Sequence, residues 1–215
     1  ITLWCSSQGH FQIGENTAKV LGISSSQVKV MPMEIGGGFG GKTTVYLEPV
    51  VALLSRKTGH PVKITMSRTD VMEASGPTAG SYMKVKMGAT RDGKLTAAQA
   101  DLKFEAGGFA GSPVSAAALC MFTPYDVENL HIDAYDIVDN KPKSTAYRAP
   151  GAPIVTYAVE VTLDEVAERL GMDPMDLRLL NVAVEGTRRA DGVMNLRIGA
   201  RETMEAVKAH PHYNA

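Results

Sequence analysis

A glycine-rich segment, Ile35–Lys42, constrains this chain of 215 residues more than any other stretch. Five of the six residues from 36 to 41 are glycine, the sixth is Phe39, and Lys42 follows. Glycine has no Cβ, so it adopts positive φ readily and lets the backbone approach another molecule closely. A glycine cluster alone would also suit a flexible loop. The aromatic ring inside the cluster and the cation after it instead favour a backbone surface that contacts a ligand.

The same residues satisfy the P-loop pattern, because Gly36 is followed by four residues and then by Gly41, Lys42 and Thr43. In a P-loop the lysine and the hydroxyl residue begin a helix whose N-terminus binds phosphate. A helix that continued from Lys42 would hold Pro49 in its interior, at a cost of about 3 kcal/mol. Met31-Pro32-Met33-Glu34 also interrupts the strand that should precede the loop. A nucleotide-binding hydrolase remains the alternative hypothesis.

Composition bounds the class of protein. The net charge is -1 at pH 7, so no basic surface indicates nucleic acid as a partner. No apolar run is long enough to cross a membrane. The two cysteines, Cys5 and Cys120, lie in unrelated contexts, which favours buried thiols in a reducing, cytoplasmic compartment. Because the chain begins at Ile1, we expect a piece of a longer protein, with one domain over 1–215 and a boundary between two lobes near 140–150.

Periodicity predicts an α+β fold with a mixed β-sheet and helices packed on one face of it. A hairpin is the clearest element, because alternating residues on both sides of Asp92-Gly93 place one face in the core. The predicted strands lie near residues 1–5, 28–30, 62–66, 83–87, 98–104 and 130–138. The predicted helices lie near residues 16–21, 47–58, 112–120, 152–170, 174–180 and 200–209.

Several segments together resemble one protein family. Gly36–Lys42 resembles the glycine-phenylalanine motif of the molybdenum hydroxylases, the xanthine dehydrogenase and aldehyde oxidase family. Ser6-Ser7-Gln8 is similar to the loop of that family that bears a cofactor-contacting glutamine, and Tyr147–Pro153 is similar to its second active-site loop. Two further segments resemble its helices and connecting strand, namely residues 48–63 and 164–174. The matches follow the family's order and cover most of the chain.

The resemblance implies the fold and the cofactors. This chain would be part of the first molybdopterin-binding domain of a large subunit, and inactive when isolated. The family holds molybdenum through the dithiolene of molybdopterin, in some members a dinucleotide, so no residue here would ligate the metal directly. It hydroxylates carbon with water as the oxygen source and passes electrons to iron–sulfur (2Fe-2S) and flavin (FAD) groups on partner domains or subunits. The remaining molybdopterin-binding domain and a small-molecule substrate would be the other partners.

The resemblance also assigns site residues. Gln8 matches the glutamine that hydrogen-bonds a ligand of molybdenum. Gly38, Phe39 and Gly40 match the loop whose N–H groups face the cofactor, and Phe39 also lines the substrate pocket. Arg148 matches a loop arginine that orients polar groups; the alternative is an arginine that anchors the loop to the core.

Departures from the family pattern bear on the substrate. Thr43 replaces the glutamate that binds purines, and Pro150 replaces a phenylalanine that stacks on them. With Phe39 and Ala149, these residues would form a substrate pocket suited to an aldehyde or an N-heteroaromatic carbon. The family's catalytic base is a glutamate of a later domain, so no residue here is assigned as a catalytic base. A non-catalytic module with the same fold is a third hypothesis.

Overall fold

The computed structural model describes residues 1–76 and 78–214, and its chain divides into two compact units. The first unit comprises Ile1–Ala79, Ala106–Ala110 and Val138–Arg148. The second unit comprises Gly80–Glu105, Gly111–Ile137 and Ala149–Ala215. The chain therefore passes from one unit to the other several times, and each unit is assembled from segments distant in sequence.

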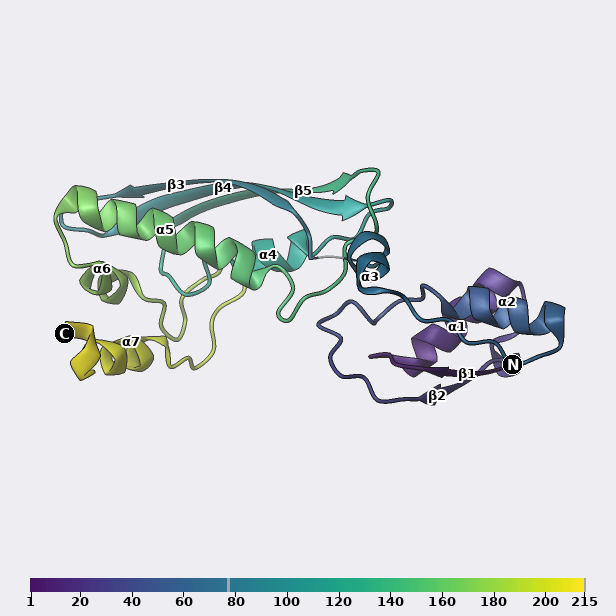
Figure 1. Cartoon of the computed structure of the whole chain (residues 1–215). Coiled ribbons are helices and arrows are strands. Elements are labelled where there is room, and N and C mark those ends of the chain that lie inside the picture. Colours follow the sequence, from purple (N-terminus) through teal and green to yellow (C-terminus); the bar gives the residue numbers. More distant parts are fainter. Residues whose placement is uncertain (77, 215) are drawn as a thin grey trace. The chain divides into compact units, whose positions relative to one another are not determined.

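The first unit is built on a parallel strand pair joined by a helix. Strands β1 (Thr2–Cys5) and β2 (Lys29–Pro32) pair in parallel with Leu3 opposite Val30, which requires a crossover connection. Helix α1 (His10–Leu21) supplies that connection and packs on β2, followed by the 3₁₀ turn η1 (Ser25–Gln27) (Figure 1). The loop that carries Gln8 thus begins where β1 ends.

Helix α1 begins earlier than the predicted helix over residues 16–21, which was wrong at its N-terminal end. Gly14 lowers the intrinsic helix propensity of that stretch. A Cβ at Gly14 would lie 3.3 Å from the Val30 side chain, so glycine allows the helix to approach β2 closely. Tertiary packing therefore outweighs local propensity. The predicted C-terminal stop is confirmed, because Gly22 caps α1 with φ +64°.

Helix α2 (Glu48–Thr58) confirms the predicted helix, with Pro49 in its first turn and Gly59 as its left-handed C-cap. The strand expected over residues 62–66 is wrong: this stretch forms no regular structure and pairs with no strand in the described part of the chain. Apolar alternation defines a strand only when a partner supplies hydrogen bonds. Helix α3 (Arg68–Ala74) follows, started by a capping box between Ser67 and Asp70 that the sequence reading missed.

The second unit is built on a three-stranded sheet in the order β3-β4-β5. Strands β3 (Ser81–Ala89) and β4 (Leu95–Gly107) form the predicted antiparallel hairpin, in which Met83 lies opposite Leu102. The predicted alternation of β4 is confirmed, because Ala98, Ala100, Leu102 and Phe104 are buried while Gln99 and Lys103 are exposed. Strand β5 is Asn129–Val138.

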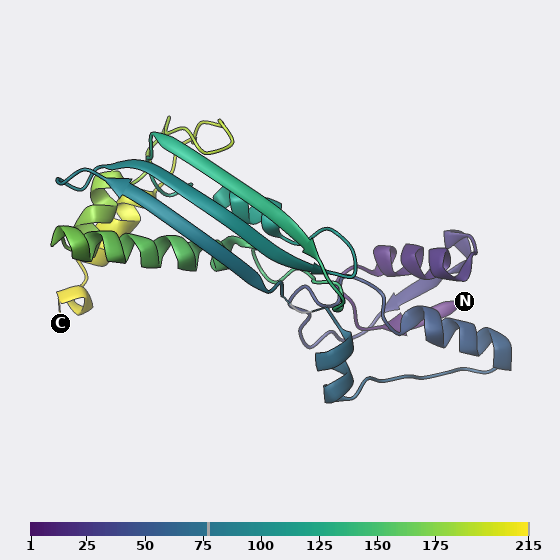
Figure 2. The same ribbon diagram turned by 90° about the horizontal axis from the view of Figure 1, so that it is seen from above.

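Helices cover one face of this sheet (Figures 1 and 2). They are α4 (Val114–Cys120) and α5 (Ala152–Leu170). Helix α6 (Pro174–Asn181) packs on α5, and α7 (Ala200–Lys208) packs on α6 and is followed by the 3₁₀ turn η2 (Pro211–Asn214). The long helix α5 packs against β3 and buries Val155, Val159, Leu163 and Ala167. The predicted α+β class is therefore confirmed. Among the described helices, none is long and apolar enough to span a bilayer.

Candidate functional site

The side chain of Gln8 lies against the glycine-rich loop in the first unit. Its Oε1 atom accepts hydrogen bonds from the backbone N–H of Gly40 (2.9 Å) and of Lys42 (3.2 Å). The Gln8 backbone N–H donates to the Lys42 carbonyl (2.9 Å). Because two N–H groups hold the amide oxygen, the orientation of the amide is fixed, and Nε2 donates to no acceptor in the described residues. Both hydrogens of Nε2 remain available to a ligand.

Glycines bring the loop into contact with its neighbours. A Cβ built on Gly38 would overlap the Gln8 side chain, and one built on Gly40 would overlap the carbonyl oxygen of Ala146. Gly40 also has φ +87°, where an L side chain is strained. The loop can therefore pack against both Gln8 and the segment before Arg148 only with glycine at these positions.

The segment Val138–Arg148 is held in the first unit by hydrogen bonds to distant residues. The Ser144 N–H donates to the Ala106 carbonyl (3.0 Å), and the Thr145 hydroxyl donates to the Gly76 carbonyl (2.8 Å). The Gly76 N–H in turn donates to the Tyr46 hydroxyl oxygen (2.8 Å). These bonds place Ala146 and Tyr147 beside the glycine-rich loop.

Phe39 projects from the loop as an exposed ring with an unusual backbone. Its φ is +50°, its side chain is 69% exposed, and its ring stacks on Tyr147 with centroids 6.1 Å apart. A Cβ on Gly37 would lie 2.9 Å from the Phe39 ring, so glycine is needed there too. The sequence did not predict a role for Tyr147. The only feature that could have indicated one is the position of this aromatic residue next to Arg148.

The backbone N–H groups of residues 36–39 make no hydrogen bond with any described residue. Four consecutive free donors next to the free Nε2 of Gln8 form a donor-rich surface. Such a surface suits a ligand with several oxygen or sulfur acceptors.

Lys42 and Thr43 are engaged inside the loop. The Lys42 ammonium donates to the Ser6 hydroxyl oxygen (2.9 Å) and to the Ile35 carbonyl (2.7 Å). The Thr43 hydroxyl donates to the Gly40 carbonyl (2.8 Å). Helix α2 begins only at Glu48, so these residues do not start a helix as a P-loop requires. The nucleotide-hydrolase alternative has no support in this geometry.

The second predicted loop contributes residues to both units. Arg148 ends the first unit, is exposed, and forms no hydrogen bond or ion pair with the described residues. Ala149, with φ +52°, and Pro150 belong to the second unit and are exposed. The first unit thus brings Gln8, Gly38, Phe39, Gly40 and Thr43 together on one loop system.

The cysteine that precedes the Gln8 loop, Cys5, is not activated as a nucleophile. Burial raises the pKa of the Cys5 thiol, and the nearby Glu48 carboxylate raises it further, against a lowering by the Ser7 hydroxyl. A raised pKa keeps the thiol protonated and unreactive. Within the described residues, no three His, Cys, Asp or Glu side chains are grouped so that they could hold a metal ion.

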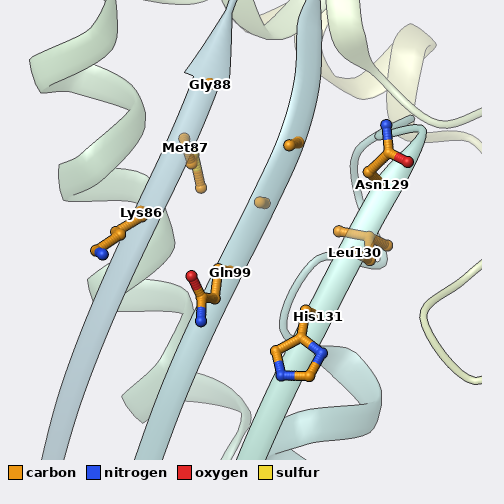
Figure 3. Close-up of a pocket in the computed structure, with 9 residues that line it drawn as sticks. Lys86, Met87, Gly88, Gln99, Asn129, Leu130 and His131 are labelled. Carbon is orange, nitrogen blue, oxygen red and sulfur yellow. The ribbon is translucent and has the colours of Figure 1, made fainter.

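The outer face of the three-stranded sheet carries a depression lined by residues of β3, β4 and β5 (Figure 3). Gly88 of β3 lies opposite Ala97 of β4, and because neither has a large side chain, a depression forms there. It is flanked by Lys86, Gln99 and the β5 residues Asn129 and His131. Two of the flanking side chains are already engaged: Asn129 donates to the Thr96 carbonyl (3.0 Å), and His131 Nε2 lies 3.0 Å from Asp133. This depression follows from small side chains and lacks a convergent donor set.

Comparison with known proteins gives a consistent picture. A family model described as a molybdopterin cofactor-binding domain matches residues 1–182. The nicotinate dehydrogenase large molybdopterin subunit of Eubacterium barkeri is 34% identical over 213 residues, which are 97% of this chain and 50% of that subunit. A putative xanthine dehydrogenase molybdenum-binding subunit of Escherichia coli is 34% identical over 86% of this chain and 25% of its own length.

A solved structure extends the likeness to three dimensions. The aldehyde oxidoreductase of Desulfovibrio gigas superposes with a TM-score of 0.92 at 25% identity, over 99% of this chain and 24% of that protein. The chain thus spans half, or about a quarter, of the length of these relatives.

Proposed function

Because the chain belongs to the molybdopterin cofactor-binding domain family, we propose that its glycine-rich loop and Gln8 form one wall of a molybdopterin pocket. The chain is then part of a longer large subunit of a molybdenum-dependent oxidoreductase. Three relatives support the proposal by their names, which are a nicotinate dehydrogenase large molybdopterin subunit, a xanthine dehydrogenase molybdenum-binding subunit and an aldehyde oxidoreductase.

The orientation of the Gln8 amide is the observation that carries the proposal. The loop binds the amide oxygen and leaves both Nε2 hydrogens free, beside the free N–H groups of residues 36–39. These residues fit an acceptor-rich pterin cofactor, because fixed donors stabilise charge on oxygen without having to reorganise. The fit needs no protein ligand to the metal.

In the complete enzyme the cofactor would supply two-electron oxidation of a carbon centre, with water as the oxygen source. The residues of this chain would bind and orient. Gln8 would donate a hydrogen bond from Nε2 to an acceptor on the cofactor. Phe39 and its stacking partner Tyr147 would exclude water from the adjacent space. Arg148, which is free of protein partners among the described residues, would bind a polar group of the substrate through its planar guanidinium.

We infer an aldehyde or an N-heteroaromatic compound as the substrate. Thr43 and Pro150 offer neither the carboxylate nor the aromatic ring expected for a purine. The Thr43 hydroxyl is also turned inward to the Gly40 carbonyl. The names of the nicotinate dehydrogenase and the aldehyde oxidoreductase fit this substrate class.

The partners follow from the same proposal. Electrons would pass to 2Fe-2S and FAD groups on other domains or subunits, and the remaining molybdopterin-binding domain would complete the pocket and supply the base. The enzyme would act in the cytoplasm.

The proposal is tested by the molybdenum and pterin content of the complete subunit, with Gln8→Glu as the informative variant. A glutamate keeps the oxygen acceptors for Gly40 and Lys42 but removes both donors. We expect a stable protein whose kcat falls at least tenfold. A fall of this size corresponds to the free energy of about one charge-assisted hydrogen bond. Gln12→Glu is the matched control, since Gln12 is exposed on α1 and its side chain bonds only Asn16 among the described residues. A subunit without molybdenum would instead support the non-catalytic module.

A further inference from the structure

We propose that Lys42 is a positioning residue that holds the Gln8 amide in its cofactor-facing orientation; this inference rests on the proposed function. Lys42 is the residue that made the loop resemble a P-loop, yet its ammonium is directed to the protein itself. Its contacts join the two ends of the glycine-rich loop to each other and to the Gln8 loop.

Lys42 binds this site through four hydrogen bonds in the first unit. Its backbone N–H donates to Gln8 Oε1 (3.2 Å), and its carbonyl accepts from the Gln8 N–H (2.9 Å). Its ammonium donates to the Ser6 hydroxyl oxygen (2.9 Å) and to the Ile35 carbonyl (2.7 Å). The main chain of Lys42 therefore fixes Gln8, while its side chain fixes the neighbouring segments.

The ammonium closes the loop at its base. Ile35 is the first residue of the glycine-rich segment and Lys42 is the last, so the bond between them links the two ends of the run. Ser6 reinforces this closure, because its hydroxyl also donates to the Ile35 carbonyl (3.3 Å). Within the loop, the Gly41 N–H donates to the Gly38 carbonyl (2.8 Å). A run of glycines has high conformational entropy when free, so a closure of this kind limits the conformations of the loop.

The chemistry of lysine suits this role. An ammonium carries three donors on a flexible stem, and hydrogen bonds from a charged donor are roughly twice as strong as neutral ones. The Ile35 carbonyl and the Ser6 hydroxyl oxygen both act as acceptors, which a neutral methionine of similar length could not serve. Loss of the ammonium would leave the Ser6–Ile35 hydrogen bond (3.3 Å) but detach Lys42 from both residues. The Lys42 backbone could then move, and the Gln8 amide could rotate away from its cofactor-facing orientation.

The test compares Lys42→Met with Lys84→Met in the complete subunit. Lys84 is an exposed lysine of β3 without a hydrogen bond or ion pair in the described part of the chain, so it controls for loss of charge. Measurements are molybdenum content, steady-state kinetics with an aldehyde or nicotinate, the electron paramagnetic resonance signal of partly reduced molybdenum, and amide hydrogen exchange of residues 36–42.

For Lys42→Met we expect amide exchange in residues 36–42 to rise about tenfold, as local opening becomes easier. We expect kcat to fall about tenfold with little change in KM, together with an altered molybdenum signal. Lys84→Met should match the unsubstituted protein in every measurement. Ser6→Ala, which removes one acceptor and keeps the Ile35 bond, should give a smaller effect in the same direction.

Two results would overturn the inference. One is unchanged kcat, molybdenum signal and loop exchange in Lys42→Met. The other is faster exchange throughout the first unit with a parallel fall in Tm, which would make Lys42 a general folding residue. Failure of the proposed function is distinct, because it would appear as absence of molybdenum from the unsubstituted subunit.

Discussion

Single residues decide whether the glycine-rich loop can lie where it does. Gly38 and Gly40 lack the Cβ atoms that would overlap Gln8 and the Ala146 carbonyl, respectively. Phe39 adopts φ +50°, which costs an L residue about 1–2 kcal/mol, and its ring lies close to Gly37 and stacks on Tyr147. The loop is therefore held in a strained shape by its neighbours, as is common where a backbone faces a ligand.

Gly40→Ala should destabilise the site more than Gly36→Ala, although both glycines have positive φ. At Gly36 no atom lies within 4 Å of a built Cβ, so only backbone strain of about 1 kcal/mol is expected. At Gly40 the new methyl group would overlap the Ala146 carbonyl, and we expect a loss above about 2 kcal/mol. Urea unfolding measures both values. Equal losses in the two variants would show that the loop does not pack against Ala146.

Residue types alone indicate part of this site. The glycine run, with an aromatic residue inside it, predicts a ligand-facing loop, and the family resemblance adds Gln8 and Arg148. The hydrogen bonds of Lys42 to Ser6 and Ile35 have no sequence signature, because they depend on how two distant loops come together. The stack of Phe39 on Tyr147 likewise arises only from the fold.

At the scale of elements, α6 is joined to the β3–β4 hairpin by one buried amide. Asn181 is fully buried and accepts from the Leu95 N–H (2.8 Å), while its Nδ2 donates to the carbonyls of Gly93 (2.8 Å) and Leu177 (2.9 Å). A buried side chain that hydrogen-bonds the backbone groups of a turn in this way fixes the position of the turn against the helix.

Asn181→Ala should lower the free energy of unfolding by about 2–3 kcal/mol, since it leaves a buried N–H and a buried carbonyl without partners. Asn129→Ala is the matched control: Asn129 is exposed on β5 and makes one hydrogen bond to the Thr96 carbonyl, so about 1 kcal/mol or less is expected. Chemical denaturation of both variants gives the comparison. A loss for Asn181→Ala no larger than that for Asn129→Ala would contradict the assigned role.

The stability that the N-terminal cap of α6 contributes should decrease in acid. Asp173 caps the helix, and hydrogen bonds from the Asp176 N–H, the Tyr213 hydroxyl and the Met175 N–H lower the pKa of its carboxyl in the folded state. A lowered folded-state pKa stabilises the protein above the unfolded pKa of about 3.9, and this contribution is lost as pH falls through the lower folded value.

We therefore expect Asp173→Asn, which keeps a capping oxygen but does not titrate, to show a shallower loss of stability below about pH 4 than the unsubstituted chain. Unfolding curves from pH 7 to about pH 2.5 measure this difference. Identical acid profiles would show that Asp173 does not contribute through its charge.

Elements follow from the sequence where one stretch carries its own pattern. The alternation in β4, the left-handed glycines after α1, α2 and α5, and the cap at Asp173 are all local signals, and the structure contains each of them. The strand expected at residues 62–66 fails because a strand needs a partner that its own sequence does not specify. The predicted start of the first helix at residue 16 is wrong because Gly14, which lowers local helix propensity, allows α1 to pack closely on β2.

At the scale of the whole molecule, segments distant in sequence build each unit. The loop system combines residues 6–8, 35–43 and 142–148 within the first unit, although nearly 100 residues separate the last two segments. No periodicity predicts such an assembly, and only the order of the family motifs indicated it. Family membership is established for residues 1–182, whereas the pocket they form remains our proposal.

The most direct test of that proposal is the position of molybdenum in a crystal of the complete subunit, located by anomalous scattering. The account predicts a single molybdenum peak beside the glycine-phenylalanine loop, with a ligand atom of the metal within hydrogen-bonding distance of Gln8 Nε2. A molybdenum peak distant from both Gln8 and Phe39 would contradict it.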